Sequence, residues 1–311
     1  MRAKMSYHEA VMAGEALEGL SIRPDGIYVD VTFGGGGHSR LILGQLGKKG
    51  RLIAFDQDED ARRNLFQDER LEFVPYNFRY LKKFLRVSGV SAVDGILADL
   101  GVSSHQLDEA SRGFSFRFDH ALDMRMTAQG ELTAARVLNT YPAERLQAIL
   151  SAYGELRNSR TLAEAIVAER GHRELRTIAD LVGIAEPLIR GNRHRYLAQL
   201  FQALRIEVND EIGALRDFLD QAIDVLRPGG RLVVIAYHSV EDRMVKHSMK
   251  TGNTDGRAES DFFGRIYRPY RIITKKALQP GDAELRSNPR SRSAKLRIAE
   301  RTDEQQHTPG A

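Results

Sequence analysis

The sequence predicts an α/β protein with an open, mostly parallel sheet of the doubly wound kind and an inserted helical domain. Short apolar runs alternate with helical patterns, which is typical of a parallel sheet. A run of four glycines follows the first apolar run, and about 130 residues separate the fourth run from the fifth. With 311 residues, 42% hydrophobic and 28% charged, the chain can form two domains or one domain with an insertion.

Seven apolar runs are the predicted strands. The first ends at the glycines, and the fourth is apolar enough to be buried on both faces. A helix is expected from about Glu59, and a long one over about 207–226 that stops at the Pro-Gly-Gly sequence beginning at Pro228. The last two strands are expected to pair antiparallel at one edge. The seven strands are expected at residues 27–33, 51–56, 71–76, 93–100, 231–237, 270–275 and 294–299.

The long interval between the fourth and fifth strands carries helical periodicity throughout. A structureless loop of that length is improbable, so we expect an all-helical domain at 110–192, inserted into a core formed by 1–109 and 193–311. Helices are expected at residues 131–139, 142–153, 159–169, 177–189 and 195–203.

The composition excludes several classes of protein. The chain has no cysteine, which excludes disulfides, thiolate metal sites and a cysteine nucleophile. No apolar run reaches the roughly 18 residues of a membrane span, and residues 1–13 lack the apolar region of a secretory signal. We therefore expect a cytoplasmic protein without a metal centre.

The positive charge is concentrated near the end of the chain. The net charge is +4, but residues 243–297 hold 14 Lys and Arg against 5 Asp and Glu. Cations interleaved with aromatic rings are typical of a nucleic-acid surface, although a solvated basic segment has the same composition. The rings in this stretch are Phe262, Phe263, Tyr267 and Tyr270.

The glycine run, Gly34 to Gly37, lies between the first strand and a helical pattern. Glycines let the backbone turn tightly beside a ligand, and the helix N-terminus offers free N–H groups. Ser39 stands where the third glycine of a G-x-G-x-x-G motif would fall. Two cofactor classes remain open, a nicotinamide dinucleotide and S-adenosylmethionine.

Two aspartates end strands next to this loop. Asp56 closes the second strand, where an acidic side chain accepts the hydroxyls of an adenosine ribose. Asp99 closes the fourth strand and is expected to point into the same crevice, because ligands of such sheets bind outside the carboxyl ends of the strands. Each aspartate is also compatible with a plain helix cap or turn.

Six long segments resemble one family, the bacterial small-subunit ribosomal RNA (cytosine-N4)-methyltransferases. They follow the family's order from about His8 to Glu300. The resemblance implies a class I, Rossmann-like methyltransferase core with a mostly parallel seven-stranded sheet and a helical insertion. It also implies methyl transfer from S-adenosylmethionine to the N4 of a cytidine in the decoding centre of 16S ribosomal RNA. The segments are VTFGGGGHS, ADLGVSSHQLD, RGFSFRFDHALDMRM, FQALRIEVNDEI, YHSVEDRMVK and NPRSRSAKLR.

The resemblance implies the residues of the site. Asp99 is expected to accept a proton or hydrogen bond at the reacting amine, and His238 to act as a proton acceptor or RNA ligand. The expected cofactor contacts are Gly36, Gly37, His38, Asp56, Phe78, Asp99 and Gln106. The expected RNA contacts are Arg117, Arg125, Arg290, Arg292 and Lys295.

The sequence departs from related patterns at two places, of which the first bears on the catalytic acceptor and the second is a mild change. Many amino methyltransferases carry Asn/Asp-Pro-Pro-aromatic at this strand end, whereas this chain has Asp99-Leu100-Gly101-Val102. Tyr237 stands where phenylalanine is commoner in the family. The small ribosomal subunit is the expected partner, for a monomer or a homodimer. The alternatives are a methyltransferase acting on DNA, protein or a small molecule, a nicotinamide-dependent oxidoreductase, and a non-catalytic RNA-binding protein.

Overall fold

The computed structural model describes residues 10–127, 130–260, 264 and 266–304, and the chain divides into two compact units. The first unit joins Met1–Gly101 to Gly213–Ala311, and the second is Val102–Ile212. The predicted helical interval, 110–192, lies inside the second unit.

The first unit contains one sheet of seven strands, in the order β3-β2-β1-β4-β5-β7-β6. Strands β1 to β5 pair in parallel, and β7 pairs antiparallel with both β5 and β6. This arrangement confirms the predicted mostly parallel sheet with an antiparallel edge. The strands are β1 Ile27–Asp30, β2 Arg51–Phe55, β3 Leu71–Val74, β4 Val93–Asp99, β5 Leu226–Ala236, β6 Tyr270–Ile272 and β7 Lys295–Arg301.

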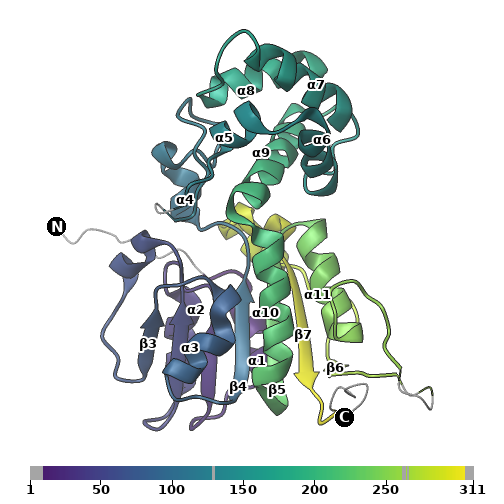
Figure 1. Cartoon of the computed structure of the whole chain (residues 1–311). Coiled ribbons are helices and arrows are strands. Elements are labelled where there is room, and N and C mark those ends of the chain that lie inside the picture. Colours follow the sequence, from purple (N-terminus) through teal and green to yellow (C-terminus); the bar gives the residue numbers. More distant parts are fainter. Residues whose placement is uncertain (1–9, 128–129, 261–263, 265, 305–311) are drawn as a thin grey trace, which may run out of the picture. The chain divides into compact units, whose positions relative to one another are not determined.

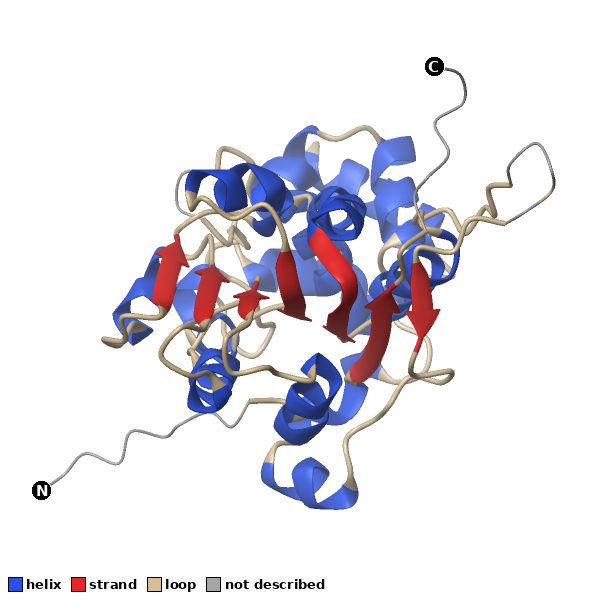
Figure 2. Cartoon of the chain, turned by 90° about the horizontal axis from the view of Figure 1, so that it is seen from below, coloured by secondary structure: helices blue, strands red, loops and turns tan. Residues whose placement is uncertain are grey.

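Helices cover both faces of the sheet, as Figure 2 shows from below, where the strands form a row across the picture with helices on either side. On one face, α1 (Ala13–Leu20) and α2 (Gly37–Gln45) pack on alternate strand residues such as Tyr28 and Leu97, which are fully buried. The other face carries α3 (Leu81–Val87) and α10 (Glu211–Val225) (Figure 1). Because both faces are covered, the central strands β2, β4 and β5 contain apolar runs without alternation.

The chain reverses its direction of winding at β1 and β4. From β1 the chain adds β2 and then β3 on one side of β1. It then crosses to the other side of β1 and adds β4 and β5. The crevice at the carboxyl ends of such neighbouring strands is where open α/β sheets bind ligands. The glycine run follows β1, Asp56 follows β2, and Asp99 is the last residue of β4.

Three predicted elements differ from the structure. The helix expected from Glu59 is a single 3-10 segment, η1 (Glu59–Asn64). The helix expected over about 207–226 is divided at Asp210, which has a φ of 47° and separates α9 (Arg193–Asn209) from α10. The Pro-Gly-Gly sequence at Pro228 lies inside β5 as an irregularity, because Leu226 already pairs with Val93.

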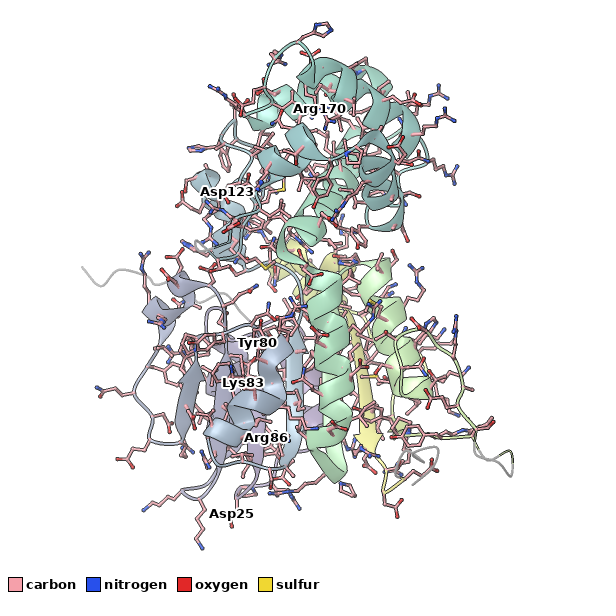
Figure 3. The ribbon with its side chains drawn as sticks, viewed as in Figure 1. Asp25, Tyr80, Lys83, Arg86, Asp123 and Arg170 are labelled. Atoms are coloured by element: carbon pink, nitrogen blue, oxygen red, sulfur yellow. The ribbon has the colours of Figure 1, made fainter. Side chains whose placement is uncertain are left out.

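The second unit is all helical and has its own core. From α9, Tyr196, Leu200 and Leu204 are buried in this core, which is why the unit extends beyond residue 192. Arg170, labelled in Figure 3, donates to the carbonyls of Leu138 and Tyr141 at 2.8 and 2.6 Å. The elements of the second unit are α4 Ser104–Asp108, η3 Ala110–Arg112, α5 Ala134–Thr140, α6 Ala143–Ala152, α7 Ser159–Arg170, α8 Ile178–Ala185, η4 Glu186–Leu188 and α9.

The remaining elements belong to the first unit. They are η2 Phe78–Tyr80, α11 Ser239–Thr251, α12 Asp282–Ser287 and η5 Pro289–Ser293. In the part of the chain that the structure describes, no helix combines the length and the apolar character needed to cross a bilayer.

Candidate active site

The glycine loop leaves β1 and leads directly into α2. Gly34 and Gly36 have φ values of 51° and 74°, which residues with a Cβ rarely adopt, and Gly35 faces open space. Among the described residues no side chain caps α2, whose N-cap residue is Gly36. The first N–H groups of α2 are therefore available to an anionic group such as a carboxylate.

Hydrogen bonds to Asp30 stabilise this loop, a role that was not predicted from the sequence. It is fully buried, its Oδ1 accepts from the Thr32 amide at 3.1 Å, and its Oδ2 accepts from the Ser39 hydroxyl at 2.7 Å. The Thr32 hydroxyl in turn accepts from the Asp99 amide at 2.7 Å. The signal that could have indicated this role is an acidic residue at the end of an apolar strand, since a buried acid needs hydrogen-bond partners.

Asp56 joins the end of β2 to the glycine loop. Its Oδ2 accepts from the Gly34 amide at 2.7 Å, and its Oδ1 accepts from the Asp58 amide at 2.8 Å. Burial raises the pKa of Asp56 to about 6, although the two amide hydrogen bonds oppose the rise. Each oxygen can accept a further hydrogen bond, which is what a pair of ribose hydroxyls requires.

Asp99 lies at the end of β4 between a histidine and a tyrosine. Its Oδ1 accepts from the Tyr237 hydroxyl at 2.7 Å, and its Oδ2 lies 3.8 Å from His38 Nδ1. His38 Nε2 lies 2.9 Å from the carbonyl oxygen of Val11. Since a carbonyl only accepts, His38 Nε2 carries a proton and donates it to Val11.

The surroundings of Asp99 make it an unusually basic carboxylate. Burial raises its pKa to about 6, the positive charge of His38 and the Tyr237 hydrogen bond lower it, and Asp30 and Glu241 raise it further. The side chain keeps 22% of its surface exposed. A partly accessible carboxylate that titrates near neutrality is typical of a group that handles protons.

Phe78 and Gln106, two expected cofactor contacts, occupy different units. Phe78 follows β3 and packs edge-on against Phe218 of α10, with ring centroids 5.5 Å apart. Gln106 belongs to the helical unit, where it is 4% exposed and completes a capping box with Ser103 at the start of α4. The cofactor roles of both residues stay predictions.

His238 lies at the first position before α11 and caps this helix. Its Nδ1 accepts from the Glu241 amide at 3.3 Å, and its Nε2 lies 3.1 Å from Glu241 Oε1. Both ring nitrogens thus face Glu241, whose carboxylate also accepts from the Tyr237 amide at 3.0 Å. This geometry favours a cap, and the catalytic role expected for His238 stays a prediction.

The five expected RNA contacts differ in their exposure and in the ion pairs and hydrogen bonds that they form. Arg125 is held by Asp123 and by the carbonyl of Gly130, with hydrogen bonds between 2.7 and 2.8 Å. Lys295 forms an ion pair with Asp242 at 3.3 Å. Arg117 and Arg292 are exposed, whereas Arg290 is half-buried.

The aromatic rings of the basic stretch are less available than expected. Tyr270 is only 4% exposed and belongs to the core, so the interpretation of its ring as a surface for bases was wrong. Tyr267 is half-buried. Phe262 and Phe263 lie outside the described residues.

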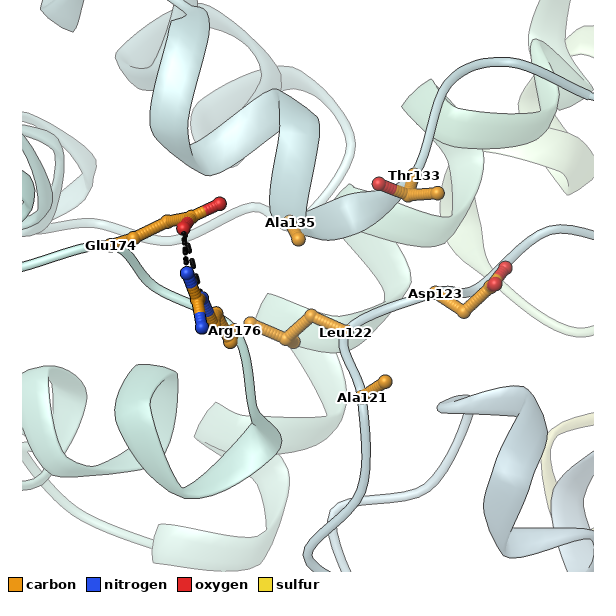
Figure 4. Close-up of a pocket in the computed structure, with 7 residues that line it drawn as sticks. All are labelled: Ala121, Leu122, Asp123, Thr133, Ala135, Glu174 and Arg176. Carbon is orange, nitrogen blue, oxygen red and sulfur yellow. Dashed lines mark hydrogen bonds and ion pairs between the residues drawn. The ribbon is translucent and has the colours of Figure 1, made fainter.

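Each unit also contains a hollow. In the first, a hollow of about 570 Å³ is bordered by α1, α2 and α12, with Gly37, Arg40 and Glu284 among its lining residues. In the helical unit, a smaller hollow of about 300 Å³ lies beside Leu122 and Asp123 (Figure 4). The ion pair of Glu174 with Arg176 borders it, at 2.6 Å.

These residues fit S-adenosylmethionine. The uncapped N-terminus of α2 suits the carboxylate of its methionine end, Asp56 suits the ribose, and the open space beside Gly35 leaves room for the ligand. Together with the sheet order and its antiparallel last strand, this site defines a class I S-adenosylmethionine-dependent methyltransferase.

The chain belongs to the MraW methylase family, whose model matches residues 5–302. It is 57% identical over 299 residues to ribosomal RNA small subunit methyltransferase H of Bacteroides thetaiotaomicron, covering 96% of this chain and 98% of that protein. It is 51% identical to the protein of the same name in Flavobacterium johnsoniae, covering 97% of this chain and all of that protein. A ribosomal RNA methylase structure from Streptococcus thermophilus aligns with a TM-score of 0.40 and 13% identity, over 94% of both chains.

Proposed function

We propose that this methyltransferase transfers a methyl group from S-adenosylmethionine to the exocyclic N4 of a cytidine in the decoding centre of 16S ribosomal RNA. The curated relatives are named as small-subunit ribosomal RNA methyltransferases, and their similarity extends over nearly the whole chain. The small ribosomal subunit is the proposed partner, in the cytoplasm, for an enzyme that works as a monomer or a homodimer.

The observation that carries the reaction is the position of Asp99. The N4 lone pair of cytosine is delocalised into the ring, so the amine is a weak nucleophile. S-Adenosylmethionine, when bound, supplies a methyl group that its sulfonium charge has already activated. Asp99 Oδ2, which has no hydrogen bond in the described part of the chain, is the proposed acceptor for an N4 proton.

The other residues are proposed to bind the cofactor and the RNA and to orient them for the transfer. Gly36, Gly37 and His38 are proposed to hold the methionine end, Asp56 the ribose and Phe78 the adenine, with Gln106 as a further contact. Alignment of acceptor and donor accounts for most of the rate in such an in-line transfer. Arg117 and Arg292 are exposed and are proposed to bind phosphates; Arg125, Arg290 and Lys295 are proposed as weaker contacts because of their burial or existing ion pairs.

The test uses small subunits from cells that lack this protein. They are incubated with the purified enzyme and methyl-labelled S-adenosylmethionine, and the RNA is digested to nucleosides for mass spectrometry. We expect label on N4-methylated cytidine, and none with Asp99→Ala. Label on protein, or on another nucleoside, would move the proposal to a methyltransferase with a different acceptor.

A further inference from the structure

Tyr237 is half-buried, and its hydroxyl has a specific partner in the proposed site. It donates to Asp99 Oδ1 at 2.7 Å, so one oxygen of the carboxylate is committed and the other is left for substrate. The Tyr237 ring lies against Gly101, where an added Cβ would come within 3.4 Å of the ring. The Tyr237 amide is tied to the buried Glu241 at 3.0 Å, so backbone and ring are both fixed.

We propose that Tyr237 is a positioning residue, whose hydroxyl orients the Asp99 carboxylate and keeps it ionised for methyl transfer. This inference rests on the proposed function of Asp99 as the proton acceptor. Burial and the charge of Asp99 raise the pKa of the Tyr237 hydroxyl, which therefore remains a donor across the working range of pH. Phenylalanine would fill the same space without the hydrogen bond.

Charged groups on three elements act on Asp99, and a charged group on a fourth acts on Tyr237. Asp30 of β1 and Glu241 of α11 disfavour its ionised form, whereas His38 of α2 and the Tyr237 hydroxyl favour it. Glu284 of α12 acts on Tyr237 and favours the protonated hydroxyl. Tyr237→Phe removes one favourable contribution and leaves the four charged groups in place, so the carboxylate should take up its proton at a higher pH.

The test compares the pH profiles of single-turnover methyl transfer to small subunits. For Tyr237→Phe we expect the midpoint of the acidic limb to rise by about one pH unit, with activity largely recovered above pH 8. The matched control is Tyr270→Phe, because the Tyr270 hydroxyl is buried and has no hydrogen-bond partner in the described structure. The profile of this control should coincide with that of the unchanged enzyme.

A second measurement separates this inference from the role of Asp99. The infrared difference between the enzyme and its Asp99→Asn variant isolates the carboxyl C=O stretch of Asp99. This stretch is titrated with pH in the enzyme that has Tyr237 and in the Tyr237→Phe variant. A midpoint that rises with Tyr237→Phe supports the inference even if Asp99→Asn proves active, which would overturn only the acceptor role. An unmoved infrared midpoint overturns the inference.

A separate observation concerns the outer face of α3. Between Glu72 and Asp94 the chain has four cations and no acid. Arg79 and Lys82 pair with Asp217 and Asp224 of α10, at 2.8 and 2.5 Å. Lys83 and Arg86, seen with Tyr80 along α3 in Figure 3, have no carboxylate partner in the described part of the chain.

Two aromatic rings accompany these cations. Tyr76 and Tyr80 are 50% and 48% exposed, and the ring of Tyr76 is held in place by stacking on Phe84 at 4.4 Å. Unpaired cations suit phosphates, and exposed flat rings suit unpaired bases. We infer that this face, defined by Tyr76, Tyr80, Lys83 and Arg86, contacts the RNA of the small subunit beside the adenine end of the cofactor site.

The test reverses the two charges. Lys83→Glu with Arg86→Glu should weaken binding to small subunits about tenfold at 0.1 M salt and reduce the salt slope by about 1–2, with unchanged cofactor affinity. Lys48→Glu with Lys49→Glu is the control, because it makes the same change of charge at the exposed turn before β2. Equal losses in both variants, or a loss seen with subunits but absent with protein-free 16S RNA, would overturn the assignment to RNA.

Discussion

At the scale of single residues, the proposed active site consists of side chains that hold the fold together and can accept further hydrogen bonds. Asp56 binds two backbone amides and still has acceptor capacity, and Asp99 binds Tyr237 through one oxygen only. Their strand-end positions could be predicted from the sequence. Their partners could not: Tyr237 is 138 residues from Asp99 in the chain, and no pattern in the sequence pairs the two.

Asp56→Ala is expected to weaken cofactor binding about 10- to 100-fold, the usual cost of a lost hydrogen bond to a charged group. The variant loses both the ribose acceptor and the contact with the Gly34 amide. Calorimetric titration with S-adenosylhomocysteine measures the change. Asp25→Ala is the control, because Asp25 is exposed and precedes β1, at the end of the sheet opposite to the glycine loop (Figure 3); equal affinities of the two variants would contradict the placement of the ribose.

Asp99→Asn is expected to stabilise the protein at neutral pH while it abolishes transfer. The pKa of Asp99 is raised to about 6 from an ordinary 3.8. Below pH 4 the carboxyl is protonated in both the folded and the unfolded state. Between pH 4 and 6 only the folded state keeps the proton, so stability falls as pH rises through this window and stays lower above it.

The asparagine variant avoids the loss of folding stability that ionisation of Asp99 causes. We place this loss at roughly 1–2 kcal/mol because the side chain remains 22% exposed. Urea unfolding at pH 7.5 and pH 4.0 measures it: the gain should be present at pH 7.5 and small at pH 4.0. A gain of the same size at both pH values would show that it does not come from the ionisation of Asp99.

At the scale of elements, the sequence predicted strands better than helix ends. The buried parallel strands are continuous apolar runs, which a sequence displays directly. The break at Asp210 is invisible to periodicity, because a left-handed residue between two helices preserves the apolar pattern on both sides. The segment at Glu59 has helix-forming residues, but η1 is a single 3-10 segment.

The start of α11 tests the predicted role of His238. Asparagine is a good N-cap, so His238→Asn should keep the thermal stability of the protein, whereas His238→Ala should lose about 1 kcal/mol. If His238 acts as a cap, as its contacts with Glu241 favour, His238→Asn also keeps most of the transfer activity. A stable His238→Asn protein without activity would instead support the catalytic role expected from the sequence.

At the scale of the whole molecule, the insertion was predictable but its limits were not. The interval between the fourth and fifth strands is far too long for a loop, which is a property of the sequence. The limits of the inserted unit depend on whether α9 packs against the core of the helical unit or against the core of the sheet unit. Because α9 contributes Tyr196, Leu200 and Leu204 to the helical core, the unit runs from Val102 to Ile212.

This division predicts that residues 102–212 fold without the rest of the chain. Their core contains residues from every one of the helices α5 to α9, among them Leu138, Leu150, Leu162 and Leu200, each with no exposed surface. The isolated segment should therefore give a helical circular dichroism spectrum and one cooperative thermal transition. Leu162→Ala should lower the free energy of unfolding by about 2–5 kcal/mol, because it leaves a cavity in this core, whereas Arg160→Ala on the exposed face of α7 should change it by less than about 0.5 kcal/mol. A segment that is helical but melts without cooperativity would show that this core needs the sheet unit to become ordered.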